Sequence, residues 1–161
     1  MKNYLYYKKQ KEGYVLKKFD HIDAFRLGEY ICKKMIKETK RAIVHIEINK
    51  ETVFEFLNSA ANPNDRDWLM KKIRCVEYFH EASAAQHVKC IEKGLDPKRE
   101  YADKDIAALG GAFPILVDGV GAIGVIGISG YEDSFDDHEA AIFGLKHLKK
   151  MQDKGRLERI F

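Results

Sequence analysis

The chain has 161 residues, of which 45% are hydrophobic and 33% charged, and its 28 basic and 25 acidic side chains give a formal net charge of +3. This composition excludes a disordered or collagen-like chain and predicts one globular domain over residues 1–161, with enough apolar surface to fold without a disulfide or metal. No apolar run is long enough for a membrane span or a secretory signal, so we expect a cytoplasmic protein without a membrane partner.

The N-terminal residues 1–13 are rich in lysine and tyrosine, a pattern compatible with an arm that follows a nucleic-acid backbone and stacks on bases. The total charge is nearly balanced, and no known nucleic-acid motif accompanies the arm. We therefore expect no nucleic-acid partner and interpret residues 1–13 as a solvated, flexible arm.

A helix and a hairpin are predicted next. Apolar residues recur at intervals of three and four from Asp20 to about Lys40, which indicates an amphipathic helix with Asp20 as its N-cap. Gly28 in its middle costs about 1 kcal/mol relative to alanine, which indicates a close packing neighbour. Residues 42–48 alternate, and residues 52–57 follow after a short turn, as expected for a β-hairpin.

The middle of the chain predicts a long helix. Residues 62–65, Asn-Pro-Asn-Asp, end the strand and cap a helix whose apolar spacing continues to Gly94. A helix of this length predicts an interruption near residues 80–83. Residues 95–109 are polar and have no clear period, so they predict a loop with one helical turn.

A second hairpin and a last helix complete the pattern. Asp118-Gly119 separates the apolar runs 114–117 and 120–129, which predicts a hairpin with a type I′ turn. The last helix opens at Ser134, which we expect to form a capping box with Asp137. The order helix, hairpin, helix, hairpin, helix predicts an α+β fold with one antiparallel sheet flanked by helices.

The run from Gly119 to Gly124 matches the dinucleotide fingerprint G-x-G-x-x-G. That motif needs a helix to begin inside it, whereas residues 125–129 are β-branched and glycine-rich and continue a strand. We therefore reject nucleotide binding here. Glycines 121, 124 and 127 instead indicate bulges or a close backbone approach.

Several stretches resemble the GlcG/HbpS-like, or haem-degrading-domain, family. They are Gly110-Gly111-Ala112-Phe113-Pro114, residues 120–125, Ser129-Gly130, and Asp137-His138-Glu139. Further upstream, Phe19-Asp20 and Asn64-Asp65 before Trp68, with Lys71, Lys72 and Arg74, resemble its subgroup of small uncharacterised cytosolic proteins. The resemblance covers most of residues 14–150 and implies a profilin-like fold that assembles as a dimer or larger homo-oligomer. The sequence departs from the family at Leu109, where a histidine is often expected, and in residues 131–136, which are slightly longer than usual.

The resemblance places a ligand site near the glycine-rich segments. Its candidate residues are Lys71, Lys72, Arg74, Gly110, Gly111, Phe113, Ser129, Gly130, Asp137 and His138. His138 is the candidate metal ligand, because histidine is the commonest axial donor to haem iron, and its alternative interpretation is a surface histidine among carboxylates. The glycines can line a pocket or simply form tight turns, and the three basic residues can bind an anion or form a solvated helix face.

Other reactive side chains give weaker patterns. His80 and His87 are seven residues apart, hence on one face of the predicted helix, but no third metal ligand accompanies them. Cys32, Cys75 and Cys90 are odd in number and contain no C-x-x-C pair, so we expect reduced, buried or idle thiols.

The leading hypothesis is a small-molecule-binding protein with haem or a related tetrapyrrole as its first candidate cofactor. The alternative is a non-catalytic homo-oligomeric assembly or chaperone-associated module. A third possibility is an enzyme acting on a small acid or cofactor precursor, which would require a coordinated metal or a perturbed acid–base pair in a cleft. No catalytic residue set stands out in the sequence.

Overall fold

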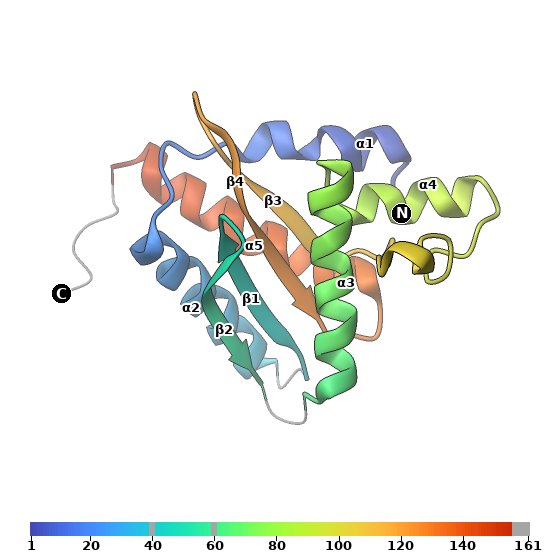
Figure 1. Cartoon of the computed structure of the whole chain (residues 1–161). Coiled ribbons are helices and arrows are strands. Elements are labelled where there is room, and N and C mark those ends of the chain that lie inside the picture. The colour runs from blue at the N-terminus through green and yellow to red at the C-terminus, as the bar shows by residue number, and fades with distance from the viewer. Residues whose placement is uncertain (39–40, 59–60, 156–161) are drawn as a thin grey trace.

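The computed structural model describes residues 1–38, 41–58 and 61–155 (Figure 1). The strands β1 (Ile43–Ile48), β2 (Glu51–Leu57), β3 (Ala112–Val117) and β4 (Gly121–Ser129) form one sheet in the order β2-β1-β4-β3. Every neighbouring pair is antiparallel. The two predicted hairpins therefore join in a single antiparallel sheet, as expected.

Helices cover both faces of this sheet. They are α1 (Tyr4–Lys9), α2 (His21–Lys37), α3 (Pro63–Phe79), α4 (Ser83–Glu92) and α5 (Ser134–Asp153), with short 3-10 helices η1 (Gln10–Tyr14) and η2 (Ala102–Lys104). Helices α2 and α5 lie together on one face and α3 crosses the other (Figure 1). The α+β prediction is confirmed, as is the helical turn in the loop at 95–109. Among the described helices, none combines the length and apolar character that a bilayer span requires.

The sheet and the helices enclose two apolar cores, a large one on the side of α2 and α5 and a small one on the side of α3. In the large core, Phe113, Ile126 and Ile128 of the sheet pack against residues of α2 and α5. These residues include Leu27 and Leu145. On the opposite face, Ile43 and Val125 pack against Leu69 and Ile73 of α3. The alternation along β1 explains this division, because successive side chains point to opposite faces. The three cysteines are buried and free.

Local signals fixed the start of α2. The Asp20 side chain accepts a hydrogen bond from the Asp23 N–H, and the Asp23 side chain accepts one from the Asp20 N–H, so Asp20 is the N-cap as predicted. A Cβ at Gly28 would lie 2.4 Å from the Phe54 ring, which confirms the close neighbour. The helix ends at Lys37, and the predicted end at Lys40 falls outside the described residues.

The predicted interruption separates α3 from α4. Asn62 caps α3, whose end is marked by His80 in the left-handed conformation with φ +59°, and the chain becomes helical again at Ser83. His80 lies at the end of α3 and His87 lies within α4, so the prediction that they share one helical face is wrong.

Two turn predictions need correction. Of the two predicted turn residues of the second hairpin, Gly119 has a positive φ and Asp118 does not, whereas a type I′ turn requires a positive φ at both. At the start of α5 the cap is Asp133, which accepts a hydrogen bond from the Phe135 N–H, and Ser134 is the first helical residue. The expected capping box fails because the Asp137 carboxylate binds other partners.

The N-terminal segment forms α1 and η1 and packs on α4, whereas the sequence analysis expected a solvated arm at residues 1–13. Tyr7 of α1 is 5% exposed and packs on Ala84, Ala85 and Val88 of α4. The Tyr4 hydroxyl donates to Glu81 at 3.1 Å. Tyr4 and Tyr7 supply the area that holds α1 in place, while Lys2, Lys8 and Lys9 stay exposed.

Candidate functional site

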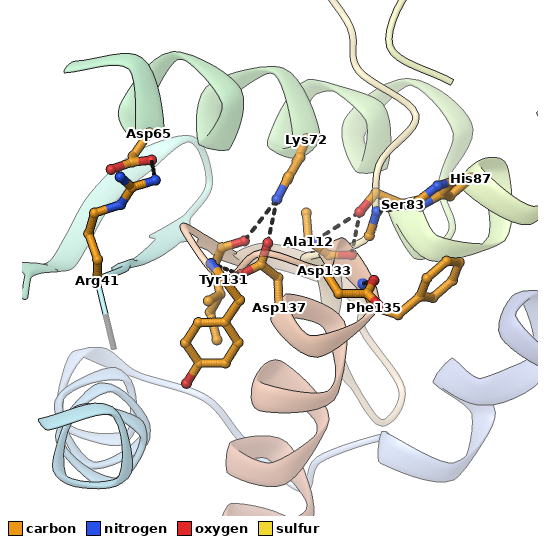
Figure 2. A network of polar contacts seen from close by, with 12 residues as sticks. Arg41, Asp65, Lys72, Ser83, His87, Ala112, Tyr131, Asp133, Phe135 and Asp137 are labelled. Atoms are coloured by element: carbon orange, nitrogen blue, oxygen red, sulfur yellow. Dashed lines mark hydrogen bonds and ion pairs between the residues drawn. The ribbon is translucent and has the colours of Figure 1, made fainter. Parts of the chain in front are cut away.

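Lys72 and Asp137, two of the predicted site residues, form a buried ion pair (Figure 2). Lys72 Nζ lies 2.9 Å from Asp137 Oδ2 and 3.4 Å from the Ile128 carbonyl oxygen, and the two side chains are 3% and 2% exposed. Asp137 Oδ1 accepts a hydrogen bond from the Tyr131 N–H at 3.0 Å. The pair therefore ties α3 to the end of β4 and the start of α5, and Lys72 is not part of a solvated helix face.

The environment of Asp137 is poor in water, and this sets its protonation. Burial raises the pKa of Asp137 to about 6, and the charge and hydrogen bond of Lys72 oppose this rise only in part. The carboxylate is thus charged at neutral pH because of its partners, which makes the pair sensitive to loss of Lys72.

The segment Gly110–Ala112 is held by Ser83 and His87, which the sequence analysis did not select as site residues; Figure 2 shows Ser83 beside Ala112. The Ser83 hydroxyl donates to the Ala112 carbonyl, and Ser83 Oγ accepts from the Ala112 N–H at 2.9 Å. His87 Nδ1 accepts from the Gly110 N–H at 3.3 Å, and burial lowers the pKa of His87 to about 4, so the ring is neutral. These contacts fix the glycine pair beside α4. The sequence alone did not indicate them, because Ser83 and His87 reach this segment only through the break between α3 and α4.

Tight backbone geometry accounts for glycine at two predicted site positions. Gly111 has φ +135° and Gly130 has φ +134°. An added Cβ would lie 2.3 Å from the Ile128 carbonyl oxygen at Gly111 and 2.3 Å from the Arg41 carbonyl oxygen at Gly130. A side chain is therefore excluded at both positions.

His138 is completely buried, which overturns its interpretation as a surface histidine. Its Nε2 lies 2.7 Å from Gln10 Oε1, and its ring packs on Tyr7 and Phe113. An amide oxygen only accepts hydrogen bonds, so Nε2 carries the hydrogen and Nδ1 keeps a lone pair, which has no hydrogen-bond partner. Burial lowers the pKa of His138 to about 4, so the imidazole is neutral.

The remaining basic candidates on α3 have partners of their own. Lys71 Nζ lies 5.0 Å from the centre of the Trp68 ring. Arg74 Nη2 lies 2.8 Å from Asp105 Oδ2, and Arg74 Nε donates to the Asp105 carbonyl at 2.7 Å. The structure thus brings Lys72, Asp137 and Gly111 together and leaves Lys71 and Arg74 apart from them.

A cleft of about 1050 Å³ opens between the N-terminal segment, the end of α2 and one side of α5. Its basic side chains are Lys34, Arg41 and Lys146, and its aromatic side chains include Tyr6, Tyr14 and Phe143. Acidic side chains are also present, and burial and the charge of Asp136 raise the pKa of Glu139. Gly130 lines this cleft, as does Gln10, the partner of His138.

Metal-ligating side chains are dispersed. Within residues 1–38, 41–58 and 61–155, no three His, Cys, Asp or Glu side chains are grouped so that they could hold a metal ion. His138 can therefore act only as a single donor to a metal that arrives with its own ligands, as haem iron does.

A family model described as "Haem degrading protein HbpS-like" matches residues 19–146. The chain belongs to the HbpS-like family. This confirms the resemblance drawn from the glycine-rich segments and Asp137-His138. The family match leaves out residues 1–18, so Tyr7 and Gln10, which contact His138, lie outside the matched region.

Relatives and solved structures agree with this HbpS-like assignment. A UPF0303 protein of Zymomonas mobilis subsp. mobilis is 30% identical over 154 residues, which cover 94% of this chain and 82% of the relative. The crystal structure of Ybr137w protein superposes with a TM-score of 0.81 at 19% identity, covering 99% of this chain and 91% of that one. A PduOC:heme complex superposes with a TM-score of 0.63 at 18% identity, covering 78% and 94%. At these identities the two structures establish the fold.

Proposed function

We propose that this HbpS-like protein binds an anionic tetrapyrrole, with haem as the first candidate, in the cleft beside α5. The cleft carries the proposal, because its volume of about 1050 Å³ is at the upper end of small-molecule sites. Tyr6, Tyr14 and Phe143 offer faces for a flat macrocycle. Lys34, Arg41 and Lys146 offer partners for propionate groups. Lys34 and Arg41 also form ion pairs with Glu38 and Asp65, which a propionate would have to share or displace. The family's description and the solved PduOC:heme complex support this choice of ligand.

His138 is the candidate axial donor. Haem supplies an iron centre that accepts a neutral imidazole nitrogen, and His138 is neutral and has an unpartnered Nδ1. Its Nε2 is reached from the cleft through Gln10, which lines the cleft and accepts the Nε2 hydrogen bond. In this proposal Gln10 is a latch: Nε2 would offer a lone pair only after the Gln10 amide releases its hydrogen and the ring proton moves to Nδ1, which has no hydrogen-bond partner.

Titration of the purified chain with haemin, followed by the Soret band, tests the proposal. We expect saturable binding, weakened about a hundredfold or more in the variant Arg41→Ala/Lys146→Ala, because two charge-assisted contacts are lost and each contributes about 1.5–3 kcal/mol when well formed. The matched control, Lys33→Ala/Lys154→Ala, removes the same charge from residues that do not line the cleft. No Soret shift, or equal affinity in both double variants, would contradict the proposed cleft.

The iron ligand is tested separately. His138→Ala should change the position of the Soret band, while Gln10→Ala should speed the appearance of the band that depends on His138. A spectrum that His138→Ala leaves unchanged would reject His138 as the donor without rejecting the cleft.

Self-assembly is a second candidate function, favoured by apolar side chains on one flank. Ile22 and Phe25 of α2 are 44% and 45% exposed, and Leu57 at the end of edge strand β2 is 49% exposed. Exposed apolar groups and an unpaired strand edge are features of association surfaces. We expect sedimentation velocity to show a homo-oligomer that Phe25→Glu shifts to smaller species, and a wild-type chain that stays monomeric at all concentrations would rule this out.

A further inference from the structure

A second pocket, of about 260 Å³, lies at the C-terminal end of α3 and shares no lining residue with the cleft. Helix α3 ends at Phe79, whereas the hairpin between β3 and β4 continues past that end (Figure 1). The sheet surface that the helix leaves uncovered is apolar there, with Pro114, Leu116 and Val125 lining the pocket. The pocket therefore has an apolar floor and one wall made by the end of a helix.

Two carboxylates lie in this pocket at the same end. Glu47 of β1 is only 6% exposed, and its Oε2 lies 2.9 Å from His45 Nε2, whose Nδ1 lies 3.0 Å from Glu55 Oε1. These hydrogen bonds raise the pKa of His45 although burial works against the charged ring. The His45 ring thus fixes Glu47 in place at the pocket.

Glu77 supplies the second carboxylate from the last turn of α3. Burial and the charge of Glu47 raise the pKa of Glu77, while the charges of Lys50 and Arg74 work against this rise. Lys50 Nζ lies 3.8 Å from Glu77 Oε2, but the Lys50 side chain is 84% exposed, so this pairing is loose. Lys50 and His80 also line the pocket, so its lining holds two carboxylates and one loosely paired ammonium group.

The end of α3 adds to the negative potential. A helix of 17 residues has a partial negative charge at its C-terminus, where cationic side chains are favourable. The last turn of α3 contains no basic residue and contains Glu77 instead. A cation at this position would complement the helix end and both carboxylates.

We propose that this pocket binds a small organic cation with a short alkyl body, its charged group between Glu47 and Glu77 and its alkyl part on Pro114 and Val125. A primary alkylammonium fits this description in charge and in apolar length. A bare divalent ion does not, because such ions take six or more oxygen ligands and no group of three His, Cys, Asp or Glu side chains suited to a metal exists among the described residues.

Titration with n-butylammonium chloride at constant ionic strength, followed by the NMR signals of the Gly124 and Val125 amides, tests this site. We expect saturable shifts, and no comparable shifts with n-butanol or sodium butyrate. Glu77→Gln keeps the side-chain shape at a partly exposed position and should weaken binding about tenfold, since one charge-assisted contact is lost. Glu100→Gln removes an exposed carboxylate that does not line the pocket and should leave affinity unchanged.

Three outcomes would overturn the inference. They are the absence of saturable shifts with n-butylammonium, equal binding of n-butanol, and equal affinity in Glu77→Gln and the wild-type chain. Haemin binding in Glu77→Gln should equal that of the wild-type chain, so failure of this pocket and failure of the cleft are distinguishable.

Discussion

Replacing Lys72 with methionine should lower the free energy of unfolding by about 3–5 kcal/mol at neutral pH, because the buried Asp137 carboxylate would lose its cationic partner. Methionine retains most of the aliphatic volume, so the effect reports charge and not a cavity. For a chain of this size each kcal/mol corresponds to about 2–4 °C in Tm. Urea unfolding followed by circular dichroism measures the loss directly.

The pH dependence gives this prediction a second readout. Burial raises the pKa of Asp137 in the folded protein to about 6, above its value of 3.8 in an unfolded chain. Because the folded protein holds the Asp137 proton more tightly than the unfolded chain does, protonation stabilises the fold. This contribution is fully present below the pKa of the unfolded chain and is lost as the pH rises through the pKa of the folded protein. The charge and the hydrogen bond of Lys72 lower the pKa of Asp137, so the loss of Lys72 raises this pKa further. The deficit of Lys72→Met relative to wild type should therefore grow between about pH 5 and about pH 8.

The matched control is the exposed ion pair that Arg74, another basic residue of α3, forms with Asp105. Arg74 and Asp105 have side chains that are 37% and 67% exposed, so Arg74→Met should cost less than about 1 kcal/mol. The double variant Lys72→Met/Asp137→Leu should regain part of the loss, because it removes both buried charges. If Lys72→Met and Arg74→Met were equally stable, the buried pair would not stabilise the fold as we infer.

The position of Lys72 shows how much of the site the sequence could have revealed. Lys71, Lys72 and Arg74 look like one charged run, yet Lys72 is three residues after Leu69 and four before Val76, both of which are buried. Helical spacing therefore placed Lys72 on the buried face. The same spacing links His138 to Ile142 and Leu145 of α5, which indicated burial for this histidine as well.

Other features could not be predicted from local patterns. The walls of the cleft come from the N-terminal segment, α2 and α5, and no spacing in the sequence brings Gln10 to His138, 128 residues away. The ordering of α1 depends on the surface that α4 offers to Tyr7. The two hairpins, in contrast, followed from the apolar alternation and the short turns, because strand pairing in hairpins is local, whereas the pairing of β1 with β4 joins distant parts of the chain.

The glycines of the second hairpin carry the other large expected effect. Gly124 is the third glycine of the G-x-G-x-x-G match, but it lies inside β4, opposite Ile48 of β1 and Ile115 of β3. An added Cβ would lie 2.0 Å from the Glu47 backbone oxygen. Because β4 is hydrogen-bonded on both sides, it cannot move away without disturbing one of its two ladders. We expect Gly124→Ala to destabilise the protein by about 3 kcal/mol, the upper range for overpacking.

Two further glycines make this prediction sharp. Gly13 has no atom within 4 Å of an added Cβ, so Gly13→Ala should change stability by no more than about 0.5 kcal/mol. A Cβ at Gly127 would meet Ile73 Cγ1 at 3.0 Å, a side chain that can shift, so Gly127→Ala should fall between the two. The order Gly124, Gly127, Gly13 in unfolding free energy lost is what strand packing requires. If Gly124→Ala were as stable as Gly13→Ala, the close approach of β1 and β4 would not explain why residue 124 is glycine. The interpretation of the G-x-G-x-x-G match as a feature of strand packing would then be wrong.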